Sequence, residues 1–122
     1  MANLAFQTEV IAVPDMPDVR AFYVKGRVTY HDAPELRKSL LGEVSVTSAS
    51  GLVVELGGVE EMDTSGAAVL VEALMLGRKR GLRLLLCSPS ESVLRMFRLA
   101  GLEEVLGHCC SDPEETMRRL QE

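Results

Sequence analysis

The fold is indicated most clearly by residues 52–87, which read LVVELGGVEEMDTSGAAVLVEALMLGRKRGLRLLLC. An apolar run at 52–56 predicts a buried β-strand, and the run at 82–87 predicts a second one. Between them, residues 65–80 carry apolar side chains at helical spacing and end in three basic residues, which suit the carboxyl end of a helix dipole. Gly81 suits the left-handed residue that ends such a helix. The stretch therefore predicts a strand–helix–strand unit, which joins parallel strands by a right-handed crossover.

The residues before this unit predict a hairpin followed by a helix. Residues 4–13 and 19–30 are β-rich, and the PDMPD turn between them is short enough to make the pair antiparallel. Residues 31–44 carry leucines at helical spacing. Asp32 stands three residues before Glu35, so the two are expected to form a capping box at the start of this helix.

The residues after the unit predict two more helices and a short strand. Residues 88–101 are expected to form a helix capped by Ser88 and ended by a glycine. Residues 105–110 predict a last short strand, and residues 111–122 a closing helix with proline in its first turn. Residues 57–62 are expected to lead away from the first buried strand.

These elements follow the order β-β-α-β-α-β-α-(β)-α, which predicts an α/β fold with a mixed, mostly parallel sheet in one domain over residues 1–122. The net charge of −5 argues against nucleic acid as a partner and against an anionic membrane surface. No apolar segment is long enough for membrane insertion. Three cysteines fit a reducing compartment, so the expected location is the cytoplasm.

The polar residues at the start of the central helix form the candidate functional motif. Asp63 is suited to cap the helix, which places Ser65 in the first turn, where unpaired N–H groups and the dipole favour an anion. A phosphate on Ser65 would gain such donors and would also lie beside the negative charge of Asp63. The same residues are also compatible with a helix cap that has no further role.

A helical wheel divides the side chains of the central helix into two groups. Four of them are expected to face the sheet: Ala67, Leu70, Val71 and Leu74. Val69 and Leu76 fall close to Glu72, away from that arc. The wheel leaves two interpretations open, a docking face for a partner or contacts between these side chains and neighbouring helices.

Catalytic and metal-binding motifs are poorly supported. Residues 63–66 resemble half of an aspartic protease motif, but those enzymes need two carboxylates that share a proton. A serine-hydrolase elbow would need glycines on both sides of Ser65, and the chain has no Gly-Lys-Ser/Thr phosphate loop. His108, Cys109 and Cys110 do not by themselves make a closed zinc site, although the adjacent thiols leave redox sensing open. We predict no metal and no cofactor.

Nearly the whole chain resembles the STAS domain, a module shared by anti-sigma factor antagonists and sulfate transporters. The resemblance rests on a strand that leads into Asp63-Thr64-Ser65-Gly66, the apolar helix, the next strand and helix, and LAGLEEVL at 99–106. It implies a four- to five-stranded sheet with helices on one side. In the antagonists, a hydroxyl in this motif is phosphorylated by a partner that is both kinase and anti-sigma factor, and the antagonist itself catalyses nothing.

Carried over to this chain, the resemblance assigns the phosphate to Ser65, with Thr64 as second choice. Asp63 and Gly66 would support the phosphorylated loop. Residues expected to contact the partner are His31, Asp32, Thr64, Val69, Glu72 and Leu76. The partner would be a serine kinase of the histidine-kinase-like ATPase fold, bound only by the unphosphorylated form, and a phosphatase would reset the switch.

One departure and two alternatives accompany the resemblance. The family often has Gly-Glu-Leu-Asp after its second strand, whereas this chain has Gly-Arg-Val-Thr at 26–29, which changes the surface beside the motif. STAS modules also serve as docking subunits of lipid-transport ABC systems and as parts of stressosome-like scaffolds. Neither alternative requires a phosphate switch.

Overall fold

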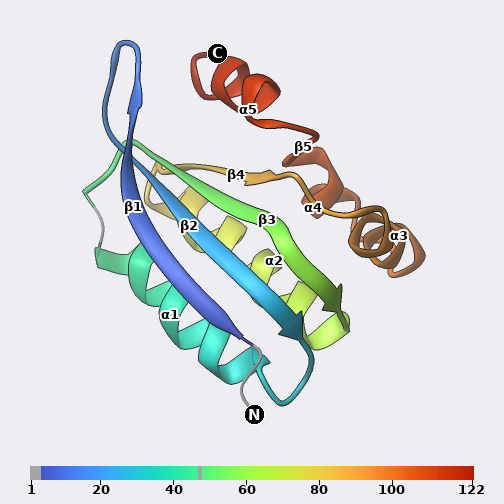
Figure 1. The fold of residues 1–122 in the computed structure, drawn as a ribbon. Helices are drawn as coiled ribbons and strands as arrows, with labels where there is room; N and C mark the ends of the chain where they lie inside the picture. The colour runs from blue at the N-terminus through green and yellow to red at the C-terminus, as the bar shows by residue number, and fades with distance from the viewer. Residues whose placement is uncertain (1–3, 47) are drawn as a thin grey trace.

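The computed structural model describes residues 4–46 and 48–122 and is built around one mixed sheet with strand order β1-β2-β3-β4-β5 (Figure 1). The strands are β1 (Ala5–Val13), β2 (Met16–Val28), β3 (Gly51–Met62), β4 (Arg83–Cys87) and β5 (Cys109–Cys110). β1 pairs with β2 in an antiparallel hairpin, and every other neighbouring pair is parallel. The predicted fold class is therefore confirmed.

Helices cover both faces of this sheet. They are α1 (Ala33–Val46), α2 (Thr64–Lys79), α3 (Glu91–Leu99), α4 (Glu103–Gly107) and α5 (Pro113–Leu120). Buried side chains of α1 to α4 share one core with the sheet, whereas Leu120 of α5 packs with Val19, Val53 and Leu85 in a second cluster. Side chains of adjacent strand residues point to opposite faces, so α5 covers the face away from α1 and α2. The expectation that all helices lie on one side is wrong.

Two local predictions about strands are also wrong. Residues 105–107, predicted to begin the last strand, instead belong to α4, which has Glu103 and Glu104 in its first turn, where the helix dipole favours acids. β3 continues to Met62 instead of ending at Leu56, because register shifts against β2 accommodate extra residues between Glu55 and Glu61.

The helix ends show which local signals are reliable. Gly81 and Gly101 both have φ of +69°, as expected for residues that end helices, and the Asp112 carboxylate accepts the Glu115 N–H at the start of α5. Ser90 rather than Ser88 caps α3, by accepting the Val93 N–H.

The predicted capping box of α1 is not formed. The Asp32 carboxylate accepts hydrogen bonds from the N–H and hydroxyl of Thr29, and it is the backbone carbonyl of Asp32 that accepts the Glu35 N–H. Asp32 therefore shapes the loop between β2 and α1.

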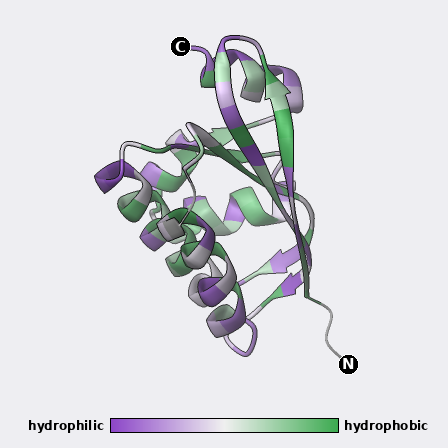
Figure 2. Cartoon of the chain, turned by 90° about the vertical axis from the view of Figure 1, so that its left-hand side faces the viewer, coloured by the Kyte–Doolittle hydropathy of each residue, from purple (hydrophilic) through white to green (hydrophobic). Residues whose placement is uncertain are grey.

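Hydrophobic and hydrophilic residues alternate along the strands and helices (Figure 2), as expected for elements that pack one face against a core and expose the other. The larger core contains fully buried side chains from α1, β3, α2 and α3, among them Leu36, Leu52, Leu70 and Phe97. Because β2 and β3 are parallel, their carboxyl ends lie at one edge of the sheet, where α1 and α2 begin (Figure 1). This edge holds the Asp63-Thr64-Ser65-Gly66 motif.

Candidate functional site

Asp63 joins two segments that are distant in the sequence. One carboxylate oxygen, Oδ1, accepts the N–H groups of Ser65 at 3.0 Å and Gly66 at 3.1 Å, and so caps α2 as predicted. The other oxygen, Oδ2, accepts the N–H of Tyr30 at 2.8 Å. The backbone N–H of Asp63 is bonded to the carbonyl of Val28 at 3.0 Å. Asp63 therefore holds the β2–α1 loop against the start of α2.

Gly66 allows α2 to begin directly against the end of β2. A Cβ atom at this position would lie 2.7 Å from Cγ1 of Val28 and 2.9 Å from Cγ of Met62, which is closer than carbon atoms pack. The absence of a side chain at Gly66 thus sets how near the first turn of α2 approaches the sheet. We expect any larger residue to displace the hydroxyl-bearing turn.

The two hydroxyl residues of the motif differ in exposure. Thr64 is exposed at the first position of α2, and Ser65, one residue later, is half-buried. The N–H groups of Ser65 and Gly66 are already bonded to Asp63. A phosphate on Ser65 would therefore compete with this carboxylate for local donors. The main local effect of such a phosphate would be added negative charge beside Asp63, and its gain of hydrogen-bond donors would be smaller than the sequence predicts.

The docking face predicted on α2 is only partly exposed. Val69 is 3% exposed and belongs to the main core, so its placement on an exposed face is wrong. Leu76 is half-buried and also packs against that core. Glu72 is exposed and forms an ion pair of 3.0 Å with Arg37 of α1. α2 is therefore buried on two sides, by the sheet and by its neighbouring helices.

The exposed surface around the hydroxyls retains three of the predicted partner-binding residues, His31, Thr64 and Glu72, and adds three others. We call it the switch surface, and it consists of Tyr30, His31, Thr64, Ala68, Glu72 and Leu99. Tyr30 is 63% exposed, and its ring centroid lies 4.0 Å from that of His31. Leu99 of α3 is 82% exposed and lines a shallow hollow of about 310 Å³ together with Thr64 and Arg95. Apolar side chains thus approach the motif from the β2–α1 loop and from α3.

The sequence reasoning missed Tyr30 and Leu99 as members of this surface. Tyr30 lies at the end of a predicted strand and Leu99 near the end of a predicted helix, and neither position by itself indicates an exposed side chain. A helical wheel of residues 91–99 would have placed Leu99 away from the buried Val93 and Phe97, which was the available signal.

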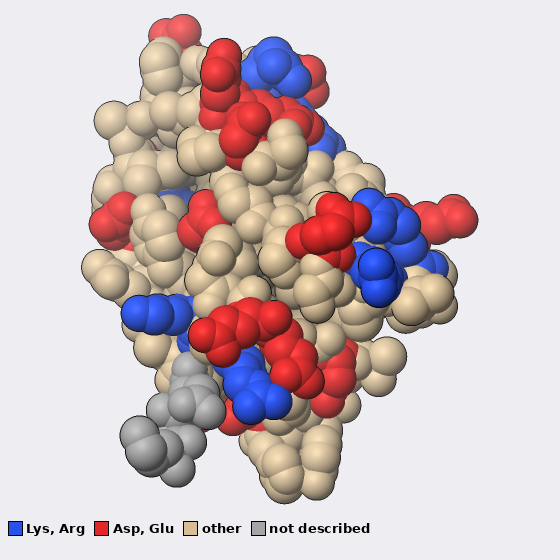
Figure 3. Space-filling model, turned by 45° about the vertical axis from the view of Figure 1, so that its right-hand side comes forward, with Lys and Arg blue, Asp and Glu red and all other residues tan. Residues whose placement is uncertain are grey.

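Acidic and basic side chains alternate over the face drawn in Figure 3, with uncharged residues between them. Near the motif, Arg27 and Glu61 form an ion pair with 2.8 Å between nitrogen and oxygen. The positive charge of Arg27 therefore partly compensates the negative charge of Glu61. Among the residues coloured in this view, the blue side chains do not merge into a continuous basic surface of the kind that nucleic acids require.

The described part of the chain offers little for metal or thiol chemistry. Within residues 4–46 and 48–122, no three His, Cys, Asp or Glu side chains lie close enough together to hold a metal ion. Burial raises the pKa of the Cys109 thiol to about 11, with a smaller contribution from Cys110, so Cys109 is a poor nucleophile near neutral pH. No helix in the same ranges is long and apolar enough to cross a membrane.

Comparison with known proteins agrees with this geometry. A family model described as the STAS domain matches residues 10–116. The anti-sigma-B factor antagonist of Listeria monocytogenes is 31% identical over 85 residues, which are 69% of this chain and 73% of that protein.

Among solved structures, the anti-sigma factor antagonist SpoIIAA in its unphosphorylated form is 18% identical, with a TM-score of 0.73 and 96% of each chain covered. The Bacillus cell fate determinant SpoIIAA in its phosphorylated form is 17% identical, with a TM-score of 0.67 over 95% of this chain and 99% of that one. At these identities the two structures show a shared fold.

Proposed function

This chain belongs to the STAS domain family, and from that premise we propose that it is an anti-sigma factor antagonist controlled by phosphorylation of Ser65. The unphosphorylated form binds an anti-sigma factor that is also a serine kinase of the histidine-kinase-like ATPase fold. Binding frees the sigma factor. Phosphorylation of Ser65 ends binding, and a phosphoserine phosphatase restores it.

One observation carries the proposal. The first turn of α2 presents two hydroxyls beside an exposed surface with apolar members, and the Asp63 carboxylate fixes that turn to the β2–α1 loop. The relative from Listeria monocytogenes is named as an antagonist, and SpoIIAA has been solved with and without phosphate. The geometry of the first turn of α2 and these two similar proteins support the same role for this chain.

The proposed mechanism is electrostatic. A phosphoserine carries about −1.5 to −2 charges at neutral pH. At roughly 6 Å, each pair of unit charges interacts by about 0.7 kcal/mol in a dielectric of 80 and by about 2.8 kcal/mol in a dielectric of 20. At the dielectric of about 20 that suits a protein surface, repulsion from one acidic group on the partner would come to about 4 kcal/mol. This would weaken binding by more than tenfold, since about 1.4 kcal/mol corresponds to a factor of ten.

The assignment of the phosphate is tested by incubating the chain with its cognate anti-sigma kinase and ATP, followed by intact-mass measurement. We expect one added phosphate, which Ser65→Ala abolishes and Thr64→Ala preserves. Ser92→Ala is the matched control, because Ser92 is an exposed serine on the neighbouring helix α3. Modification that persists in the Ser65→Ala and Thr64→Ala variants alike would refute the proposed acceptor.

The switch itself is tested by calorimetric titration of the bare and phosphorylated chains with the same partner. We expect the bare chain to bind and the phosphorylated chain to bind at least tenfold more weakly. Leu99→Ser removes an exposed apolar contact from the switch surface, whereas Val10→Ser makes a comparable change on β1, where Val10 is 69% exposed. Only Leu99→Ser is expected to weaken binding, and equal affinities for all forms would contradict the mechanism.

A further inference from the structure

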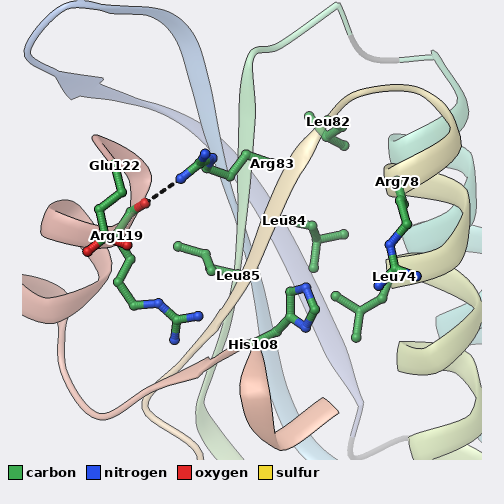
Figure 4. A pocket seen from close by; sticks show the side chains of 9 residues that line it. All are labelled: Leu74, Arg78, Leu82, Arg83, Leu84, Leu85, His108, Arg119 and Glu122. Carbon is green, nitrogen blue, oxygen red and sulfur yellow. Dashed lines mark hydrogen bonds between the residues drawn. The ribbon is translucent and has the colours of Figure 1, made fainter. Parts of the chain in front are cut away.

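A second hollow lies at the other end of α2 from the hydroxyl motif. It has a volume of about 260 Å³ and is formed by the end of α2, the first half of β4, the turn before β5, and α5 (Figure 4). Buried leucines form its apolar part: Leu74, Leu82, Leu84 and Leu85. Its polar part consists of Arg78, Arg83, Arg119, His108 and Glu122.

The hollow exists because β5 is much shorter than β4. β5 pairs only with Leu86 and Cys87, at the carboxyl end of β4. The N–H of Leu86 is bonded to the carbonyl of His108 at 2.9 Å, on the β5 side. Backbone groups two residues apart in a strand point the same way, so those of Leu84 point toward the β5 side as well, beyond the beginning of β5. An open stretch of strand edge therefore faces the hollow.

Two of the three arginines of the hollow, Arg83 and Arg119, are held in place by neutral acceptors. Arg119 donates to the carbonyl oxygens of Cys109 at 3.0 Å and Gly107 at 2.7 Å. Arg83 donates to the carbonyl of Arg119 at 2.7 Å, which is the dashed line in Figure 4. Carbonyl oxygens orient a guanidinium group without cancelling its charge. These two side chains are therefore positioned cations.

Acids compensate only part of the positive charge. Arg78 forms an ion pair with Glu104, and Glu122 is the acid among the lining residues. Among these side chains, three arginines against two acids leave an excess of one positive charge, in a chain whose formal net charge is −5. A local excess of positive charge in an acidic protein favours an anionic ligand at this place.

We propose that this hollow binds a small molecule that carries a phosphate or carboxylate group. Arg83 and Arg119 bind the oxyanion, since a guanidinium offers paired N–H donors that match the oxygens of either group. The Leu84 N–H adds a backbone donor, and the leucines contact the apolar part of the ligand. The volume accommodates a metabolite-sized molecule. The site is separate from the switch surface and does not depend on the proposed function.

The test is a titration of the full chain, labelled with ¹⁵N, with inorganic phosphate and separately with succinate. Ionic strength is held constant with NaCl. We expect saturable shifts of the Leu84 and His108 amide signals with one or both probes, and the probe that binds more tightly identifies the oxyanion. Arg83→Gln is expected to weaken binding about tenfold, the effect of losing a charged hydrogen bond.

Arg98→Gln is the matched control, because Arg98 is an exposed arginine of α3 outside the hollow. It is expected to bind the probes as the unmodified chain does. The remaining amide signals of Arg83→Gln show whether the variant keeps the fold, and Arg83→Lys provides a second variant that keeps the charge without the paired donors. Shifts that fail to saturate, that NaCl alone reproduces, or that Arg83→Gln and Arg83→Lys leave unchanged would overturn the proposal.

Discussion

Replacing Asp63 with alanine is expected to destabilise the fold by more than a helix cap contributes. The loss of a capping side chain costs about 1 kcal/mol, within a range of about 0.5–2 kcal/mol. Asp63 also accepts the Tyr30 N–H at 2.8 Å, and a hydrogen bond to a charged acceptor contributes about 1.5 kcal/mol or more. The free energy of unfolding should therefore fall by about 2–3 kcal/mol.

This loss is measured by urea denaturation or by thermal melting. For a chain of this length, a loss of 1 kcal/mol lowers the melting temperature by roughly 3–5 °C, so Asp63→Ala should lower it by about 6–15 °C. Asp63→Asn separates the contributions. Its amide oxygen can still cap α2, but its NH₂ group cannot accept the Tyr30 N–H. We expect Asp63→Asn to lose mainly the contact with the β2–α1 loop, seen as faster hydrogen exchange of the Tyr30 amide.

Asp112→Ala is the control for a cap with only local contacts, because the Asp112 side chain accepts the Glu115 N–H at the start of α5. It should cost about 1 kcal/mol. If Asp63→Ala costs no more than Asp112→Ala, and exchange at Tyr30 is unchanged, then the bond across the two segments contributes nothing and the reasoning is refuted.

Three further predictions concern packing, ionisation and the exposed face of α2. Gly66→Ala should lower the free energy of unfolding, measured by denaturant melts, by about 1–3 kcal/mol through overpacking, whereas Gly42→Ala, with open space around it, should raise it by about 0.5–1 kcal/mol. Equal effects of the two variants would contradict the close approach of α2 to β2 at Gly66. Burial raises the pKa of Cys109 from 9.0 to about 11, so the protonated thiol contributes to the free energy of unfolding below pH 9, and this contribution is lost as pH rises to about 11. Cys109→Ala should therefore reduce the fall in the free energy of unfolding between pH 9 and pH 11, and an unchanged fall would disprove the prediction. Val69→Asp should abolish cooperative unfolding, because it buries a charge, whereas Ala68→Asp should keep the melting temperature and weaken partner binding; the opposite pattern would reverse the assignment of the two faces.

The sequence by itself determined the features that depend on neighbouring residues. The hairpin, the parallel unit at 52–87, the cap at Asp63 and the glycine at 81 were all predicted, because periodicity, capping and left-handed backbone are decided within a few residues. The same local logic failed at Ser88 and Asp32. Ser90, two residues after Ser88, caps α3 in its place, and the Asp32 carboxylate accepts a hydrogen bond from Thr29 instead of capping α1.

Tertiary structure alone decided which surfaces are left for function. A helical wheel cannot show that Val69 is buried in the main core, nor that α5 crosses to the other face of the sheet. It also cannot show that Asp63 reaches Tyr30, 33 residues away, or that a short β5 leaves an open edge beside Arg83. Contacts of this kind depend on how elements distant in the sequence pack together, and their free energies are not encoded in any single segment.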